Sequence, residues 1–212
     1  MSFRTRVKIC GITRVEDALT VSRYGADAIG LVFYEKSPRN INVGQAIEIC
    51  KALPAFVTVV ALFKDASEDF VRSVINQVPI DLLQFHGIET ESFCLQFEKP
   101  YIKAVGMSGQ NDVVDFAKQY TSARGLLLDS HAVGEDGGSG HVFDWGSIPK
   151  DIQGQIALAG GLTADNVADA ISQVRPFAVD ISSGVESSGG IKDEALIKAF
   201  MSEVKRVDCE HE

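Results

Sequence analysis

Cys10 and Asp129 are the two residues of this chain whose types and positions most strongly suggest acid–base chemistry. Cys10 ends a short apolar run at residues 6–10, and Asp129 ends a later one at residues 125–129. A thiolate can remove a proton and a protonated carboxyl group can donate one, so the two residues are candidates for a general base and a general acid. Free cysteines are more often small buried apolar residues, and this alternative stands for Cys10.

The elements that would bring the two residues together are short apolar strands that alternate with amphipathic helices. Eight segments have the continuous Val, Ile and Leu content of strands buried on both faces. The expected strands cover residues 6–10, 28–33, 56–63, 80–85, 100–105, 125–129, 155–159 and 177–182. The expected helices cover residues 14–24, 43–52, 67–77, 90–97, 109–120, 145–148, 163–173 and 193–206. Strict alternation of this kind predicts an α/β fold with parallel strands.

Eight strand–helix units predict a closed (β/α)8 barrel, the TIM barrel, with one parallel sheet formed by residues 1–212 as a single domain. An open doubly wound sheet is the alternative, but such sheets usually have five or six strands. The active site of a barrel lies at the carboxyl ends of its strands. Polar residues that directly follow the strands are therefore the candidate site.

Composition restricts the partners of the chain. The 212 residues include 20 Lys and Arg against 29 Asp and Glu, a formal net charge of −9, and no basic run is dense enough to follow a phosphate backbone. We therefore expect no nucleic-acid partner. The longest apolar stretch, residues 55–63, is too short to span a bilayer, and residues 1–6 do not precede a long apolar segment. We expect no membrane association and a cytoplasmic location.

The cysteines and histidines of the chain are scattered and show no metal-ligand spacing. They are Cys10, Cys50, Cys94, Cys209, His86, His131, His141 and His211. We therefore predict free thiols and no metal site.

Two glycine-containing segments follow the seventh and eighth expected strands. The first includes Gly160 and Gly161, and the second includes Ser182, Ser183 and Gly184. Glycine lets backbone N–H groups approach a phosphate closely, and the loops after these two strands form the usual phosphate site of a barrel. Each segment alone is more often an ordinary turn, but both together at these positions predict phosphate binding.

Charged residues at other strand ends extend the candidate site. Arg39 follows Pro38 in the second loop, and its guanidinium is suited to a planar carboxylate, although a solvated loop arginine is an equally good interpretation. Lys8 lies two residues before Cys10 and faces the same side of the strand. Asp180 on the neighbouring last strand is its expected partner. This pair is either structural, or favours the Cys10 thiolate, or touches the substrate.

Several motifs occur in an order that resembles the phosphoribosylanthranilate isomerase family of tryptophan biosynthesis. They lie at residues 8–13, 83–87, 127–129, 137–140, 143–145, 159–162 and 177–186. The resemblance extends from end to end, and the Lys-Ile-Cys-Gly opening is its most diagnostic part. It implies an Amadori rearrangement of N-(5-phosphoribosyl)anthranilate to 1-(2-carboxyphenylamino)-1-deoxyribulose 5-phosphate, without a cofactor.

On the matching positions, the general base of the family falls on Cys10 and its general acid on Asp129, the pair indicated by the strand ends. Asp129 would protonate the furanose ring oxygen, and Cys10 would then remove the C2′ proton. Aspartic acid ordinarily titrates at about 3.9 and a thiol at about 8.5. We therefore expect the site to raise the pKa of Asp129 and to lower the pKa of Cys10.

The resemblance also implies which residues bind the substrate. It places the anthranilate carboxylate at Arg39, the phosphate at the two glycine segments, and either an orienting hydrogen bond or a substrate contact at His86; Asp180 completes the predicted substrate-binding set. Two departures from the family pattern are Asn40, in place of a common aromatic residue, and residues 187–192, in place of a Pro-Gly-Lys region. The glycine-rich stretch 130–144 is long enough to predict a functional loop.

Two other functions share parts of this pattern. A pentose-phosphate epimerase would use the same glycine segments but usually needs paired carboxylates or metal-binding histidines at strand ends, which we do not find. A sugar-phosphate sensor without catalysis would not need Cys10 and Asp129. Each interpretation has a small phosphorylated molecule as the partner. The sequence leaves open whether the chain is a monomer or a homodimer.

Overall fold

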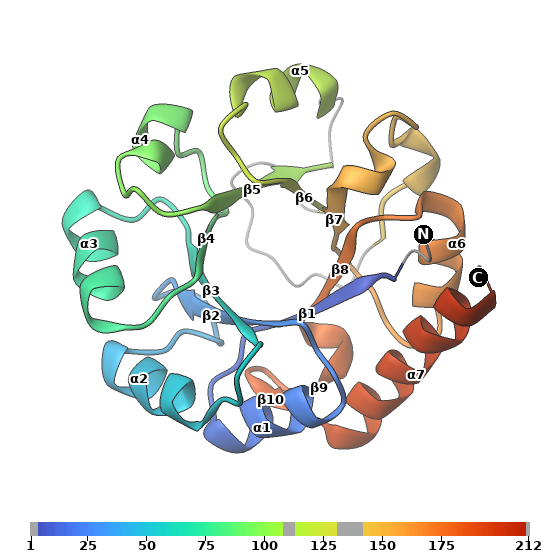
Figure 1. The fold of residues 1–212 in the computed structure, drawn as a ribbon, viewed down its shortest axis with the longest axis horizontal. Helices are drawn as coiled ribbons and strands as arrows, with labels where there is room; N and C mark the ends of the chain where they lie inside the picture. Colours follow the sequence, from blue (N-terminus) through green and yellow to red (C-terminus); the bar gives the residue numbers. More distant parts are fainter. Residues whose placement is uncertain (1–3, 108–112, 131–141, 211–212) are drawn as a thin grey trace.

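Eight parallel strands form a closed barrel in the order β1 to β8, with β8 paired to β1 (Figure 1). The computed structural model describes residues 4–107, 113–130 and 142–210. The strands are β1 (Arg6–Cys10), β2 (Ala28–Phe33), β3 (Thr58–Phe63), β4 (Leu82–Phe85), β5 (Tyr101–Gly106), β6 (Leu126–Asp129), β7 (Ile156–Leu158) and β8 (Ala178–Ile181). The predicted barrel is confirmed, and the open-sheet alternative is wrong.

Helices surround the barrel on its outer side. They are α1 (Val15–Arg23), α2 (Val43–Ala52), α3 (Glu68–Gln77), α4 (Glu91–Leu95), α5 (Val113–Gln119), α6 (Val167–Val174) and α7 (Glu194–Glu210). In the described part of the chain, no helix is long and apolar enough to cross a membrane.

Helices α6 and α7 differ from their predicted bounds, and α7 extends to Glu210 instead of ending at residue 206. Between β6 and β7, the short helix predicted at residues 145–148 is the 3-10 helix η1 (Trp145–Ser147), and a second 3-10 helix, η2 (Gln153–Gln155), precedes β7. Helix α6 begins at Val167, later than predicted, because the Asn166 side chain holds the preceding residues in a turn. Its Oδ1 accepts from the Thr163 N–H at 2.8 Å, and its Nδ2 donates to the Gly161 carbonyl at 2.9 Å.

Alternation along the strands divides the apolar side chains into two layers. The larger layer packs between the barrel and the helices and includes the fully buried Ile9 and Val179. The smaller layer consists of Ala104, Leu127 and Ala159. These three residues face the opposite side of the sheet, inside the barrel. Cys10, Asp129 and Asp180 also face this interior, so polar side chains occupy it at the carboxyl ends of the strands.

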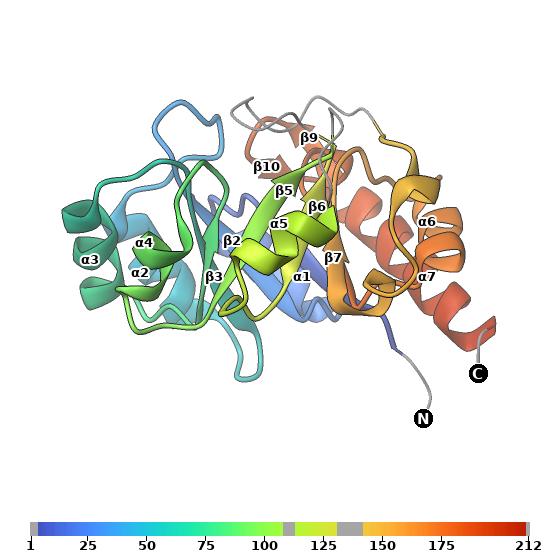
Figure 2. The same cartoon turned by 90° about the horizontal axis from the view of Figure 1, so that it is seen from above.

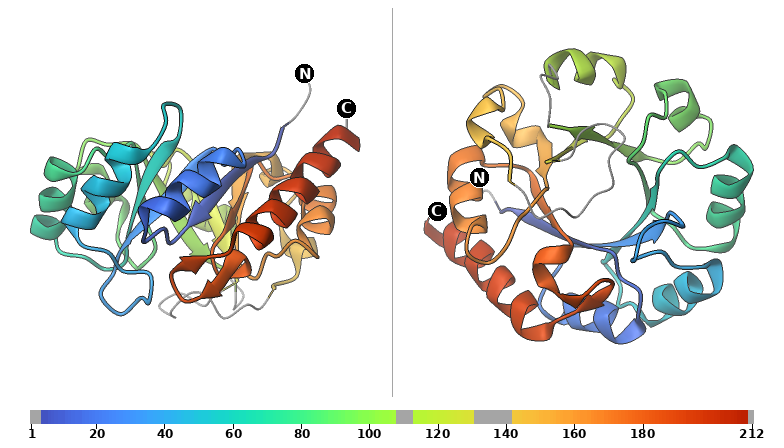
Figure 3. Two further views of the ribbon diagram at one scale, coloured as in Figure 1. Left: turned by 90° about the horizontal axis from the view of Figure 1, so that it is seen from below. Right: turned by 180° about the vertical axis from the view of Figure 1, so that it is seen from behind.

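A short hairpin between β8 and α7 packs against the β1–α1 segment. It consists of β9 (Glu186–Ser188) and β10 (Ile191–Lys192). Thr13 donates its hydroxyl to the Gly190 carbonyl, and Asp17 accepts from the Lys192 N–H at 3.2 Å. The hairpin lies at the end of the barrel opposite the N-terminus (Figures 2 and 3). Residues 187–192, a departure from the family pattern in sequence, thus form part of the barrel end.

A buried ion pair supports the loop that follows β4. The Lys103 ammonium lies 3.1 Å from the Glu89 carboxylate and donates to the Phe85 carbonyl at 3.3 Å and to the Gly87 carbonyl. Glu89 also accepts from the Gly87 N–H at 2.9 Å. Because Lys103 and Glu89 both bind backbone groups of residues 85–87, the pair holds the backbone around His86 in one conformation.

Candidate active site

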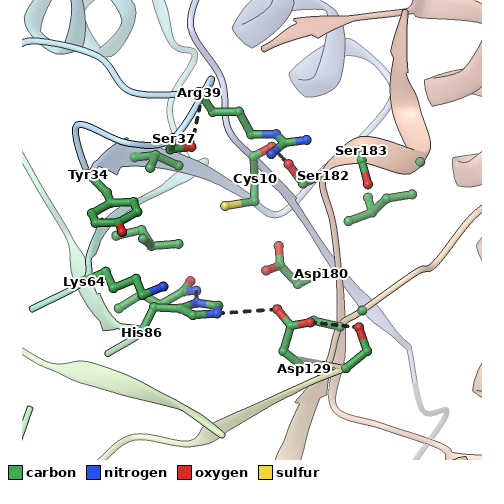
Figure 4. Close-up of a pocket in the computed structure, with 18 of the residues that line it drawn as sticks. Cys10, Tyr34, Ser37, Arg39, Lys64, His86, Asp129, Asp180, Ser182 and Ser183 are labelled. Atoms are coloured by element: carbon green, nitrogen blue, oxygen red, sulfur yellow. Dashed lines mark hydrogen bonds and ion pairs between the residues drawn. The ribbon is translucent and has the colours of Figure 1, made fainter. Parts of the chain in front are cut away.

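One cavity at the carboxyl ends of the strands contains every residue of the predicted site (Figure 4). The predicted residues in its lining are Cys10, Arg39, His86, Asp129, Gly160, Gly161, Asp180, Ser182, Ser183 and Gly184. They come from the ends of β1, β4, β6, β7 and β8 and from the loop after β2. The strand-end rule thus identified a set of residues that share one space.

Cys10 ends β1 with its sulfur directed into the cavity. The residue is 6% exposed, so only a narrow face is accessible. Gly30 on the neighbouring β2 makes room for it, because a Cβ at that position would lie 2.6 Å from the Cys10 sulfur. The Cys10 thiol therefore packs closely against β2 on one side and faces the cavity on the other.

The pKa of Cys10 is raised above its ordinary value, because burial disfavours the thiolate. The Lys8 and Lys192 ammonium groups lower this pKa, whereas the Asp180 carboxylate raises it. The expectation that the site lowers the Cys10 pKa is therefore wrong. Burial outweighs the two nearby cations.

Alkylation of Cys10 by iodoacetamide is expected to be slow at neutral pH. A raised pKa leaves little thiolate, and the thiolate is the nucleophile. The rate at Cys10, followed by peptide mass spectrometry, should keep increasing at pH values where an unstructured cysteine peptide has already reached its plateau. A midpoint below that of the peptide would contradict the dominance of burial.

Lys8 and Asp180 form an ion pair beside Cys10. Their strands are in register at these residues, and the Lys8 Nζ lies 2.9 Å from the Asp180 Oδ1. Both side chains are 9% exposed. Burial disfavours the ammonium form of Lys8, but Asp180 and Cys10 overcome this and raise the pKa of Lys8. The predicted pairing is confirmed, and it places a lasting positive charge next to the thiol.

Asp129 ends β6 and contacts two polar side chains. The His86 Nε2 lies 3.5 Å from the Asp129 Oδ2, and the Ser130 hydroxyl lies 3.5 Å from its Oδ1. On its other side, the His86 Nδ1 lies 3.1 Å from the Gln84 Nε2. An amide N–H that donates to Nδ1 leaves the ring proton on Nε2, which faces Asp129. His86 therefore lies where it can orient the Asp129 carboxyl group.

Arg39 is held by Glu186 from the hairpin. The Arg39 Nε lies 2.8 Å from the Glu186 Oε1 and its Nη2 lies 2.7 Å from Oε2. The Arg39 side chain is 12% exposed, so the interpretation as a solvated loop arginine is wrong. Glu186 occupies one edge of the planar guanidinium. The outer edge, formed by Nη1 and the second hydrogen of Nη2, is suited to a second carboxylate.

The two glycine segments pack against neighbouring loops at distances that exclude a side chain. Gly160 and Gly161 have φ values of 87° and 64°, in the left-handed region that favours glycine. A Cβ at Gly160 would lie 2.5 Å from the Ser130 backbone nitrogen, and one at Gly184 would lie 2.1 Å from the Leu162 carbonyl oxygen. The loops after β7 and β8 therefore touch each other and expose backbone to the cavity.

Several polar residues in or beside the cavity had no predicted role. Gln84 and Lys64 line it, and Lys64 directly follows β3, so the strand-end rule applied to that strand would have found it. The Lys64 Nζ lies 5.2 Å from the centre of the Tyr34 ring. Glu186 and Lys192 belong to the hairpin, and nothing in the strand–helix alternation indicates their position. Most of the predicted loop 130–144, residues 131–141, lies outside the described residues.

Comparison with known proteins shows the family of this chain. The family model for N-(5'phosphoribosyl)anthranilate (PRA) isomerase matches residues 7–203. The N-(5'-phosphoribosyl)anthranilate isomerase of Alcanivorax borkumensis is 53% identical over 207 residues, which cover 94% of this chain and 95% of the relative. That of Pseudomonas putida is 53% identical over 201 residues, covering 95% and 98%.

Solved structures agree with the sequence relatives. The crystal structure of phosphoribosyl anthranilate isomerase from Thermotoga maritima has a TM-score of 0.86 and 42% identity, covering 95% of this chain and 99% of that one. A phosphoribosyl anthranilate isomerase in complex with reduced 1-(o-carboxyphenylamino)-1-deoxyribulose 5-phosphate has a TM-score of 0.84 and 40% identity over the same shares. The predicted family, fold and enzyme class are confirmed: this chain belongs to the N-(5'-phosphoribosyl)anthranilate isomerase family.

Proposed function

We propose that this protein converts N-(5-phosphoribosyl)anthranilate into 1-(2-carboxyphenylamino)-1-deoxyribulose 5-phosphate, with Asp129 as general acid and Cys10 as general base. The observation that carries the proposal is the convergence of Cys10, Asp129, Arg39 and the two glycine segments on one cavity. These groups match the three parts of the substrate, which are the reacting sugar carbons, the aromatic carboxylate and the phosphate. Family membership supports the proposed reaction, and the types of residue that line the cavity support the roles proposed for Asp129 and Cys10.

Asp129 begins the reaction as the protonated acid. It donates its proton to the furanose ring oxygen, the bond from that oxygen to C1′ breaks, and the nitrogen lone pair forms the C1′=N bond of a Schiff base. The carboxylate that remains is stabilised by a hydrogen bond from the Nε2–H of His86, which lies 3.5 Å away. Gln84 supports this arrangement because its amide holds the other ring nitrogen.

Cys10 completes the rearrangement as the thiolate. It removes the C2′ proton from the Schiff base, the electron pair of the broken C–H bond forms the C1′=C2′ bond of an enolamine, and the π pair of the C1′=N bond returns to nitrogen. A proton added at C1′ and the loss of the C2′ hydroxyl proton give the ketone, so the overall reaction is an isomerisation. Acid and base must hold opposite protonation states together. Lys8 favours the thiolate from one side of Cys10.

Arg39 binds the anthranilate carboxylate through the edge of its guanidinium that Glu186 leaves open. Replacing it with alanine is expected to raise KM for the substrate by about 10- to 100-fold, in keeping with the loss of a charge-assisted hydrogen-bond pair. Inhibition by inorganic phosphate should change little, because the phosphate binds at the glycine segments. Initial-rate measurements with phosphate as a competitor test this. An equal loss of phosphate affinity would move Arg39 into the phosphate site.

The phosphate binds between Gly160–Gly161 and Ser182–Gly184. Support comes from the contact between the two loops and from the left-handed backbone at Gly160 and Gly161. Helix α6 begins six residues after Gly161, and the element that directly follows β8 is the short 3-10 helix η3 (Ser183–Val185). Backbone N–H groups of the loops themselves, rather than a long helix, therefore supply the hydrogen bonds to the anion.

The chain acts as one domain on a small phosphorylated substrate, without a cofactor, in the cytoplasm. The single-domain proposal is supported by the pairing of β1 with β8, which joins the first and last strands of the barrel in one sheet. The assembly is a monomer or a homodimer; one solved relative comprises monomers made from a dimeric enzyme of Thermotoga maritima. Light scattering coupled to size-exclusion chromatography distinguishes these two states.

The test of the proposed function is consumption of freshly generated N-(5-phosphoribosyl)anthranilate, followed by its fluorescence in the presence of a metal chelator. The expected result is turnover that resists the chelator and yields a product of unchanged mass. Binding without turnover would support a sugar-phosphate sensor. Loss of turnover on chelation would indicate a metal-dependent enzyme.

A further inference from the structure

Lys192 lies fully buried where β1, β8 and the hairpin meet, and its side chain is 0% exposed. Its Nζ donates to the Cys10 carbonyl at 2.6 Å, to the Ser182 carbonyl at 3.1 Å and to the Glu186 Oε1 at 2.8 Å. A neutral amine has only two N–H groups, so three acceptors match the charged ammonium. Burial lowers the pKa of Lys192, whereas Glu186 and Cys10 act in the opposite direction.

Glu186 connects this ammonium to Arg39. Its carboxylate accepts from Lys192 and, with both oxygens, from Arg39. The side chain is 5% exposed, and although burial favours protonation, the two cations hold the pKa of Glu186 below its ordinary value. Two cations and one anion leave one positive charge, which a substrate carboxylate would neutralise. The three side chains thus form a continuous path from the carboxylate site to the Cys10 backbone.

We propose that Glu186 and Lys192 are positioning residues of this isomerase: Glu186 turns Arg39 so that the outer edge of its guanidinium faces the substrate carboxylate, and Lys192 joins that unit to the Cys10 end of β1. This inference rests on the proposed function. It identifies the specificity for a carboxylated aromatic amine as a property of three residues rather than of Arg39 alone.

The same geometry links the carboxylate site to the reactivity of the thiol. The charged groups that act on the pKa of Cys10 are Lys8 from its own strand, Asp180 from β8 and Lys192 from the hairpin. Arg39 is also near, because Cys10 contributes to raising the pKa of Arg39. Lys192, which belongs to the hairpin, lowers the pKa of Cys10 and so opposes the effect of burial. Glu186 is paired with Lys192, so its negative charge offsets part of the positive charge of that lysine.

Lys103 provides a matched control. Like Lys192, it is a buried lysine that donates to two backbone carbonyls and one glutamate. Its side chain is 1% exposed and supports the loop after β4. A change that acts only through lost packing or an unpaired buried glutamate should therefore appear in both lysine variants, whereas an effect on Cys10 should appear in the Lys192 variant alone.

The first arm of the experiment measures the pH dependence of Cys10 alkylation by iodoacetamide in Lys192→Met, Glu186→Gln and Lys103→Met. Peptide mass spectrometry isolates the Cys10 signal. We expect the midpoint to rise by about one pH unit in Lys192→Met, to fall in Glu186→Gln, and to stay unchanged in Lys103→Met. Unchanged midpoints in the first two variants, or shifts in the same direction, would overturn the electrostatic link. Glu186→Gln preserves side-chain size and keeps the test available if Lys192→Met does not fold.

The second arm measures binding of the reduced carboxyphenylamino-deoxyribulose 5-phosphate and of the same compound without its carboxylate. Glu186→Gln is expected to weaken the first by about tenfold or more and to leave the second within about twofold, because an amide cannot accept both guanidinium bonds. Tighter binding of the carboxylated compound, or equal losses for both, would overturn the positioning role. Neither arm requires turnover, so failure of the proposed reaction in the wild-type protein is seen separately.

Discussion

Replacing Asp129 with asparagine is expected to lower kcat by about 10²- to 10⁴-fold. Asparagine keeps the size of the side chain and can still accept a hydrogen bond from His86, which lies 3.5 Å from the carboxyl oxygen. It cannot donate a proton to the furanose ring oxygen, so ring opening loses its acid. The measurement is the fluorescence-monitored consumption of N-(5-phosphoribosyl)anthranilate at saturating substrate.

The matched control for this variant is Ser130→Ala. Ser130 contacts the same carboxyl group, at 3.5 Å from Oδ1, but the proposed mechanism assigns it no proton transfer. Its loss should change kcat by about fivefold or less, as for one weak hydrogen bond. Phosphate inhibition should be similar in both variants and the wild type. If Asp129→Asn keeps a near-normal kcat, another group supplies the proton and the acid has been assigned to the wrong residue.

Replacing Cys10 with serine is expected to lower kcat by about 10²- to 10⁴-fold as well. The hydroxyl occupies nearly the same space, and Gly30 leaves room for it. A serine hydroxyl is a far weaker acid than a thiol, so the alkoxide that would remove the C2′ proton does not form at neutral pH. Single-turnover measurements should show that the substrate binds and the step after ring opening stops.

Cys94→Ser provides the control for the loss of a buried thiol. Cys94 is fully buried in the outer apolar layer, where burial raises its pKa to about 12. This variant should lose stability to urea, because a hydroxyl replaces an apolar contact, while its kcat should stay near that of the wild type. A comparable loss of kcat in both serine variants would indicate that packing rather than base catalysis explains the effect at Cys10.

The pH dependence of catalysis follows from the raised pKa of Cys10. The base must be deprotonated. We therefore expect kcat/KM for the wild type to rise with pH through the pKa of the Cys10 thiol in the free enzyme. Lys8 and Lys192 act against the effect of burial, and a substrate carboxylate that neutralises the Arg39–Glu186–Lys192 unit would change their balance. The thiol of the complex therefore need not titrate where the free thiol does.

The sequence by itself determined the barrel and the end of it that contains the site. Buried parallel strands need continuous apolar runs, and these runs located all eight strands. Because the carboxyl ends of parallel strands meet at one end of a barrel, residues as distant as Cys10 and Asp129 could be placed together without knowledge of any contact. The in-register pairing of Lys8 with Asp180 followed in the same way from the closure of the barrel.

Only the tertiary structure decided how the site is charged. The sequence indicates no partner for Arg39, because Glu186 reaches it through a hairpin that interrupts the strand–helix pattern. The raised pKa of Cys10 could not be foreseen either, since it depends on how completely the surrounding chain excludes water. Periodicity reports the local conformation of successive residues. Burial and ion pairing depend on contacts between segments that are distant in the sequence and meet only on folding, so no single stretch of sequence predicts them.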